Sequence, residues 1–113
     1  MNLSGLKLAI VGLGYVGLPL AIEFGKTFNN VRGFDVNKKR IDELNSFLDI
    51  TGEMLPSAIR RATKLKFCNN LKEIIDCNCY IIAVPTPVNK KNIPDLKLLI
   101  DASKLVAQVL KKK

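Results

Sequence analysis

Gly12-Leu13-Gly14-Tyr15-Val16-Gly17 is the stretch of this sequence that decides its fold. A short apolar run at 6–11 precedes it, and such a run is typical of a strand buried on both faces of a parallel sheet. The residues that follow, 15–28, carry apolar side chains four positions apart, as one face of a helix does. Three glycines at this spacing, between a strand and a helix, predict a turn that binds phosphate groups.

Each glycine of this turn has its own physical role. Gly12 permits the tight turn, Gly14 lets a pyrophosphate approach the backbone, and Gly17 lets the helix pack closely on the strand. The backbone N–H groups at the start of the helix, around Tyr15 and Val16, are then expected to hold the phosphates with the help of the helix dipole. The competing interpretation is a glycine-rich turn that binds nothing.

An acidic residue completes the pattern. Asp35 lies 23 residues after Gly12 and 18 after Gly17, at the end of a second predicted strand, 31–36. In dinucleotide-binding folds an acid at this distance accepts hydrogen bonds from the adenosine ribose. A carboxylate there also repels the 2′-phosphate of NADP, so the sequence predicts NAD as cofactor. The alternative role for Asp35 is to cap the next helix.

Three basic residues, Lys38, Lys39 and Arg40, follow Asp35. They could form a solvated basic turn, or one of them could flank the adenine or face a phosphate. Arg40 is the better candidate because its planar guanidinium group can stack. We expect Asp35 to outweigh these cations in the choice of cofactor, because they begin a helix and can swing into solvent.

A proline-rich stretch, Val84-Pro85-Thr86-Pro87-Val88, ends the fourth predicted strand, 79–84. Ligands of open α/β folds bind at this carboxyl edge of the sheet. Val84, Pro85 and Thr86 are therefore candidates for lining the cofactor site, although a proline that merely stops the strand is the simpler interpretation.

The rest of the chain continues the alternation of strands and helices. Apolar patterns and capping residues predict a third strand at 65–68, helices at 37–48 and 57–63, a helical turn at 69–75 and a last helix at 95–110. In the last helix Leu99, Ala102, Val106 and Leu110 are expected to share the buried face. We therefore predict an α/β fold, a Rossmann-like parallel sheet of about four strands with helices on both faces.

Composition limits the function classes. The chain has 113 residues, 48% hydrophobic and 25% charged, which fits one globular domain. No apolar run is long enough to span a membrane, and we expect a cytoplasmic protein. All of the +8 net charge lies in residues 57–113. Without interleaved aromatic residues or a nucleic-acid-binding motif, this charge is expected to be a solvated surface that binds duplex DNA only weakly.

Cysteine and histidine content excludes several kinds of site. Histidine is absent, which removes histidine-based triads and general bases. Cys77 and Cys79 form a C-x-C pair, but no fourth ligand is evident, so we predict no metal site. Together with Cys68 they are interpreted as thiols of buried strands and not as nucleophiles.

Several motifs in order resemble the UDP-glucose/GDP-mannose dehydrogenase family. They are the glycine turn continued through Leu18-Pro19-Leu20-Ala21, then Gly33-Phe34-Asp35-Val36-Asn37, Thr51-Gly52-Glu53, Ala83-Val84-Pro85-Thr86-Pro87-Val88 and Pro94-Asp95-Leu96. Within the family the pattern is most similar to bacterial UDP-N-acetylhexosamine 6-dehydrogenases of surface-polysaccharide synthesis. The resemblance covers nearly the whole chain. One departure is Cys77-Asn78-Cys79, where the family more usually has small or acidic residues.

The resemblance implies an activity and a division of labour. Family members oxidise C6 of a nucleotide sugar twice, from alcohol to carboxylate, with two molecules of NAD⁺. By resemblance, Gly12 to Gly17 would hold the pyrophosphate, Asp35 the ribose and Arg40 the adenosine side, and Thr86 would line the cleft. The family's catalytic cysteine and its helpers match no motif here. We therefore expect residues 1–113 to be the N-terminal NAD-binding part of a longer, homodimeric enzyme, inactive alone, with the UDP-sugar bound by a further domain.

Two other functions compete with this interpretation. A stand-alone NAD-binding or regulatory module without catalysis would carry the same glycine turn and the same acid. Nucleic-acid binding through the basic second half is disfavoured by the composition. The sequence does not identify the sugar.

Overall fold

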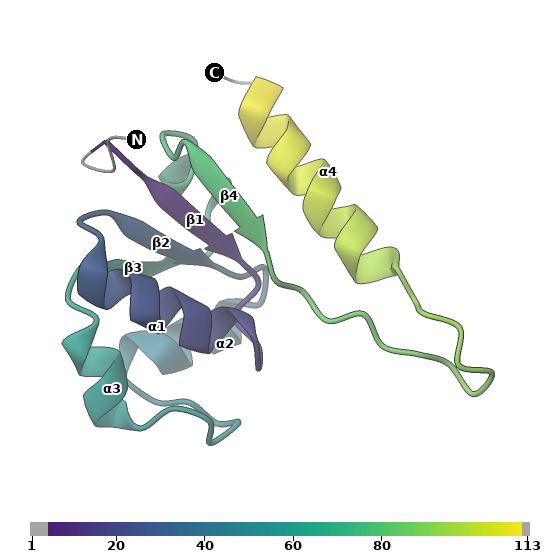
Figure 1. Ribbon diagram of the computed structural model, residues 1–113, viewed down its shortest axis with the longest axis horizontal. Coiled ribbons are helices and arrows are strands. Elements are labelled where there is room, and N and C mark those ends of the chain that lie inside the picture. Colours follow the sequence, from purple (N-terminus) through teal and green to yellow (C-terminus); the bar gives the residue numbers. More distant parts are fainter. Residues whose placement is uncertain (1–4, 112–113) are drawn as a thin grey trace.

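A four-stranded parallel sheet in the order β3-β2-β1-β4 forms the centre of the computed structural model, which describes residues 5–111 (Figure 1). Strands and helices alternate, as the sequence predicts, so each parallel pair is joined by a crossover. The strands are β1 (Leu8–Val11), β2 (Val31–Phe34), β3 (Leu65–Cys68) and β4 (Cys79–Ile82). The helices are α1 (Gly17–Thr27), α2 (Lys38–Asn45), α3 (Pro56–Arg61), the 3-10 turn η1 (Leu71–Glu73) and α4 (Lys97–Lys111).

Strand β1 lies between two neighbours and is buried along its whole length. Leu8 pairs with Val31 on one side and with Cys79 on the other. Successive side chains point to opposite faces of the sheet. Leu8 and Ile10 accordingly belong to one hydrophobic cluster and Ala9 and Val11 to the other. A strand buried on both faces explains why this run is apolar throughout, apart from Lys7 before it.

The two faces carry different helices. Helices α1, α2 and α3 cover one face through Leu18, Ile22, Leu44 and Ile59, whereas α4 and the η1 segment cover the other. Helix α1 packs so closely on β3 that a Cβ at Gly25 would lie 2.6 Å from the Cβ of Leu65. The predicted Rossmann-like α/β fold with helices on both faces is confirmed.

The face that α4 buries is rotated from the predicted one. Ala102 and Val106 are buried as expected, but the third buried residue is Val109, and Leu110 is 52% exposed. Leu99 is half-buried. The prediction placed Leu110 four residues after Val106. Because a helix turns once per 3.6 residues, repeated steps of four drift off the buried face, and a step of three leads to Val109 instead.

Several elements are shorter than predicted, and the backbone gives a reason for α2. This helix starts after Asn37, whose side chain accepts hydrogen bonds from the N–H groups of Lys39 and Arg40, so the predicted cap is confirmed. It ends at Asn45 because Phe47 adopts a φ of 60°, which a helix cannot continue. Strands β2 and β4 each stop two residues before the predicted ends. Strand β3 has the predicted bounds.

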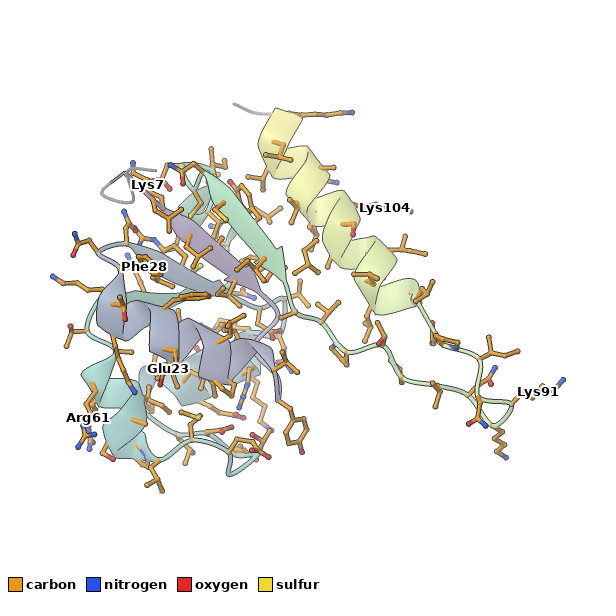
Figure 2. All side chains as sticks on the ribbon, in the orientation of Figure 1. Lys7, Glu23, Phe28, Arg61, Lys91 and Lys104 are labelled. Carbon is orange, nitrogen blue, oxygen red and sulfur yellow. The ribbon has the colours of Figure 1, made fainter. Side chains whose placement is uncertain are left out.

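Strand β4 lies at one edge of the sheet and leads into a long exposed connection to α4. All four β4 side chains are only partly buried. The connection runs away from the sheet and returns, held by an isolated antiparallel bridge between Val88 and Pro94, and Figure 2 shows Lys91 at its outer end. Within residues 5–111, none of the helices combines the length and apolarity needed to cross a membrane.

Candidate functional site

The glycine turn joins β1 to α1 by a backbone path that few side chains would permit. The Gly12 N–H donates to the Phe34 carbonyl at 2.8 Å, and the φ of Gly12 is +104°, a conformation that favours glycine. A Cβ at Gly17 would collide with the Gly12 carbonyl oxygen. A Cβ at Gly14, in contrast, would meet no described protein atom within 4 Å. The space in front of Gly14 is therefore open to a ligand.

The start of α1 offers its backbone N–H groups to an anion. Val16 stands at the N-cap and its side chain makes no capping hydrogen bond, and the first turn holds no acidic residue. Within α1 the Leu18 N–H donates to the Gly14 carbonyl at 3.1 Å and Pro19 has no N–H, so the donors available to a ligand are those of the turn before Leu18. The helix dipole makes this end positive. Tyr15 and Val16 are 66% and 69% exposed, so their side chains leave this end accessible. These features suit a phosphate group.

Asp35, directly after β2, is tied to the glycine turn. One carboxylate oxygen, Oδ2, accepts the Leu13 N–H at 3.0 Å, and Oδ1 accepts the Asn37 N–H at 2.9 Å. A carboxylate has about four lone-pair sites, so roughly two remain for further donors such as ribose hydroxyls. Asn69 fixes the same segment by donating to the backbone carbonyls of Asp35 and Val36. The acid and the turn thus form one unit.

Arg40 does not swing into solvent, contrary to expectation. Its Nε donates to the Leu13 carbonyl at 2.8 Å, and its Nη1 donates to Asp49 Oδ1 at 2.8 Å. The Arg40 side chain is 11% exposed and that of Asp49 is fully buried. Of the neighbouring cations, Lys38 forms an exposed ion pair with Asp42 at 3.2 Å. The sequence could not show that Arg40 is buried, because its partner lies nine residues away in a loop.

Asp49 is a charged residue next to the site that sequence reasoning missed. Its carboxylate accepts hydrogen bonds from Arg40, from the N–H and hydroxyl of Thr51 and from the N–H of Met54. Burial by itself raises the pKa of Asp49, but these hydrogen bonds and the Arg40 charge outweigh burial and hold the pKa below its ordinary value. The signal in the sequence was Asp49-Ile50-Thr51, since an aspartate often bonds the backbone two residues on.

A cavity of about 520 Å³ connects these parts, a size typical of small-molecule sites. Gly12, Gly14, Asp35 and Arg40 line it on one side. Its other side is formed by Val84 and Pro85 and by α4, through Leu98, Asp101, Ala102 and Leu105. The α4 residues were not predicted, although their three- and four-residue spacing marks a single helix face.

A second hollow of about 330 Å³ adjoins the glycine turn. Tyr15, Val16, Val84 and Pro85 line it together with Gly14 and Ala83. Two of the predicted site residues line neither hollow: Gly17, which packs against Gly12, and Thr86, which is exposed. The structure therefore brings most of the predicted residues together around two adjoining spaces.

The cysteines do not contribute to this site. Cys68 and Cys77 are buried in the hydrophobic cluster beneath α4, and Cys79 is half-buried in β4. Burial, and after it the charge of Glu73, raises the pKa of Cys68 to about 12, so its thiol stays protonated at neutral pH. Among residues 5–111 there is no group of three or more His, Cys, Asp or Glu residues placed to hold a metal ion.

Comparison with known proteins identifies the family. Residues 6–113 match the model of the UDP-glucose/GDP-mannose dehydrogenase family, NAD binding domain. A UDP-N-acetyl-D-glucosamine 6-dehydrogenase from Salmonella typhi is 53% identical over 109 residues, which cover 96% of this chain and 25% of the relative. Another from Pseudomonas aeruginosa is 47% identical over 110 residues, with 97% of this chain and 26% of the relative covered.

A solved structure agrees. The UDP-D-ManNAc dehydrogenase from Pyrococcus horikoshii superposes with a TM-score of 0.78 at 33% identity, covering 92% of this chain and 26% of that one. This chain thus spans about a quarter of the length of the relatives it matches. The glycine turn, the acid after β2 and the parallel sheet agree with the family expected from the sequence. The chain belongs to the UDP-glucose/GDP-mannose dehydrogenase family and corresponds to its NAD-binding domain.

Proposed function

We propose that the protein containing this chain is an NAD-dependent 6-dehydrogenase of UDP-N-acetylhexosamines, and that residues 5–111 bind the adenosine diphosphate half of the cofactor. One observation carries the proposal: the Leu13 N–H···Asp35 hydrogen bond of 3.0 Å joins the glycine turn to the acid within one cavity. A dinucleotide needs both parts at once, a positive helix end for its pyrophosphate and an acceptor for its ribose.

The residues present fit the cofactor. The open space in front of Gly14 admits a pyrophosphate, and the backbone N–H groups of the turn around Tyr15 and Val16, at the start of α1, would donate to it. The remaining lone pairs of Asp35 accept from the ribose hydroxyls. Val84 and Pro85 line both hollows, and the next residue along the chain, the exposed Thr86, offers a hydroxyl. Bound NAD⁺ supplies the hydride acceptor for the oxidation.

The substrate class follows from the relatives. Two proteins that are 53% and 47% identical to this chain carry the name UDP-N-acetyl-D-glucosamine 6-dehydrogenase, whereas the UDP-D-ManNAc dehydrogenase structure is 33% identical. UDP-N-acetyl-D-glucosamine is accordingly the first substrate to test. The product would be a nucleotide-linked uronic acid, a building block for surface polysaccharide. We further propose a cytoplasmic homodimer without affinity for nucleic acid, in line with the family resemblance and the absence of a nucleic-acid-binding motif.

The experiment is a steady-state assay of the full-length protein with NAD⁺ and a panel of UDP-sugars, followed by NADH absorbance. We expect NADH formation with a UDP-N-acetylhexosamine, two NADH for each sugar oxidised, and a uronic acid product by mass spectrometry. Residues 1–113 expressed alone are expected to give no NADH. NAD⁺ binding by the full-length protein without oxidation of any UDP-sugar would instead favour a binding or regulatory module.

A further inference from the structure

Asp49 belongs to a loop that folds back onto the cofactor cavity without lining it. We propose that Asp49 determines cofactor specificity by holding the Arg40 guanidinium in a buried ion pair, so that Arg40 is withheld from the 2′-phosphate of NADP. Asp49 is in this view a positioning residue, because it acts through Arg40. The inference goes beyond the proposed oxidation of a UDP-sugar and rests only on the cofactor site.

The loop holds the Asp49 carboxylate firmly. Three donors come from its own loop: the Thr51 N–H at 3.1 Å, the Thr51 hydroxyl at 2.6 Å and the Met54 N–H at 3.0 Å. The fourth donor is Arg40, and the carboxylate has no exposed surface. Oδ1 accepts three of these hydrogen bonds, including the one from Arg40, and Oδ2 accepts the one from Met54, so both oxygens are tied to the loop and Oδ1 is directed at Arg40.

Arg40 is a cation adjacent to the proposed ribose site. It lines the same cavity as Asp35, and Leu13 connects the two, because its N–H donates to Asp35 and its carbonyl accepts from Arg40 Nε. Within the described residues, Nη2 of Arg40 is a buried nitrogen without a hydrogen-bond partner. The guanidinium thus has one unused donor group, on a residue that lines the cavity next to Asp35.

Asp49 decides what this cation does. In dinucleotide-binding folds an arginine near the acid of β2 accommodates the 2′-phosphate of NADP. Here a phosphate would have to compete with a buried carboxylate 2.8 Å from Nη1, and separating a buried ion pair is costly. Glu43 is a second ion-pair partner of Nη1, at 3.9 Å, and no hydrogen bond joins the two, so this contact is longer than the one to Asp49. Loss of the Asp49 charge would therefore leave Arg40 with only the longer contact to Glu43, and so more available to an anionic ligand.

The test is a pair of fluorescence titrations of the full-length protein with NADH and with NADPH, which need no sugar substrate. For the isosteric change Asp49→Asn we expect the ratio of the two dissociation constants to move toward NADPH by about tenfold, the lower range for a hydrogen bond to a charged group. The double variant Asp49→Asn with Arg40→Gln should lose this gain, since the released cation is then absent.

The matched control is Asp42→Asn, which also releases a cation from its partner on α2. The Lys38–Asp42 pair is exposed, with 77% and 63% of the two side chains accessible, so its loss should leave the ratio unchanged. If Asp49→Asn does not yield folded protein, Thr51→Val removes the hydroxyl that bonds the same oxygen, Oδ1, and should shift the ratio in the same direction by about twofold.

The outcomes separate this proposal from the one before it. Equal weakening of NADH and NADPH by Asp49→Asn, or a gain in NADPH affinity that persists in the double variant, would overturn the role of Asp49. If Thr51→Val is measured in place of Asp49→Asn, an unchanged ratio of the NADH and NADPH dissociation constants would likewise overturn the role of Asp49. Failure of the wild-type protein to bind NADH would overturn the cofactor site itself. A specificity shift without oxidation of any UDP-sugar would support Asp49 and reject only the proposed reaction.

Discussion

The two walls of the cavity beside the glycine turn are built differently. On one side, the glycine turn, Asp35, Arg40 and Asp49 are joined by a continuous series of hydrogen bonds of 2.8–3.0 Å. On the other side, Val84, Pro85 and the first turns of α4 are positioned by apolar contacts and an exposed connection (Figure 1). The first wall is fixed before a ligand arrives, whereas the second depends on the packing of one amphipathic helix.

Gly17→Ala tests how little the first wall tolerates. The new Cβ would collide with the Gly12 carbonyl, so we expect the free energy of unfolding to fall by about 3 kcal/mol, the upper range for overpacking. Gly14→Ala is the matched control, because its Cβ meets no described protein atom within 4 Å. It should leave stability within about 0.5 kcal/mol but weaken NADH binding. Thermal unfolding and NADH titration of the full-length protein measure both, and equal stabilities would contradict this account of the turn.

Asp35→Ala probes the centre of the same wall. A charge-assisted hydrogen bond contributes roughly 1.5–3 kcal/mol, or about ten- to a hundredfold in affinity. The full-length protein should prefer NAD⁺, and this variant should weaken NAD⁺ more than NADP⁺ and narrow the gap. Dissociation constants for both cofactors provide the measurement. If the wild type bound the two equally, or if the ratio did not change, the role given to Asp35 would be wrong.

The same substitution in the segment that supports each wall, the loop after α2 and the connection after β4, sharpens the comparison. Thr51→Val removes the hydroxyl that donates to Asp49 at 2.6 Å and should lower the free energy of unfolding by about 1.5 kcal/mol. Thr86→Val changes an exposed side chain of the connection and should alter it by less than about 0.5 kcal/mol. Denaturant titration of the wild type and the two variants measures these changes in the free energy of unfolding. Equal losses would mean that the second wall is as tightly determined as the first.

Low pH should reduce the contribution of Asp49, which supports the first wall, to the free energy of unfolding. Because the folded-state pKa of Asp49 lies below the ordinary value of 3.8, its contribution to stability is fully present above that value. The contribution is lost as pH falls through the lower, folded pKa. The wild type should therefore lose stability below about pH 4 more steeply than Asp49→Asn, which lacks this proton-linked part. Unfolding curves between neutral and acidic pH test this, and parallel profiles would exclude Asp49 as a contributor.

Sequence reasoning was most successful where the signal is local. The glycine turn, the Asn37 cap and strand β3 each depend on a few adjacent residues, and the structure has them where they were predicted. Element ends were less accurate, because the φ of Phe47 ends α2 early and no residue type announces it. The family followed from several short motifs in a fixed order.

The parts of the site that were missed depend on long-range contacts. Arg40 was expected to face the adenosine side from the start of a helix, with freedom to swing into solvent, and only the return of the loop after α2 brings Asp49 to within 2.8 Å of it. The α4 side of the cavity likewise depends on how the helix is rotated against the sheet, which shifted the buried face from Leu110 to Val109. The spacing of apolar residues predicts that a segment is helical, but it does not show against which element the helix packs, and this packing determines which residues are buried.

The position of β4 at the sheet edge has a consequence for the behaviour of this domain in solution. As the edge strand of the described sheet, with half-covered side chains, it is a template on which a second copy of the domain can add a strand. The net charge of +8 opposes that approach by mutual repulsion. Since salt shortens the range of such repulsion to about 8 Å at physiological ionic strength, the isolated domain should remain dispersed best in dilute buffer and self-associate as salt is added.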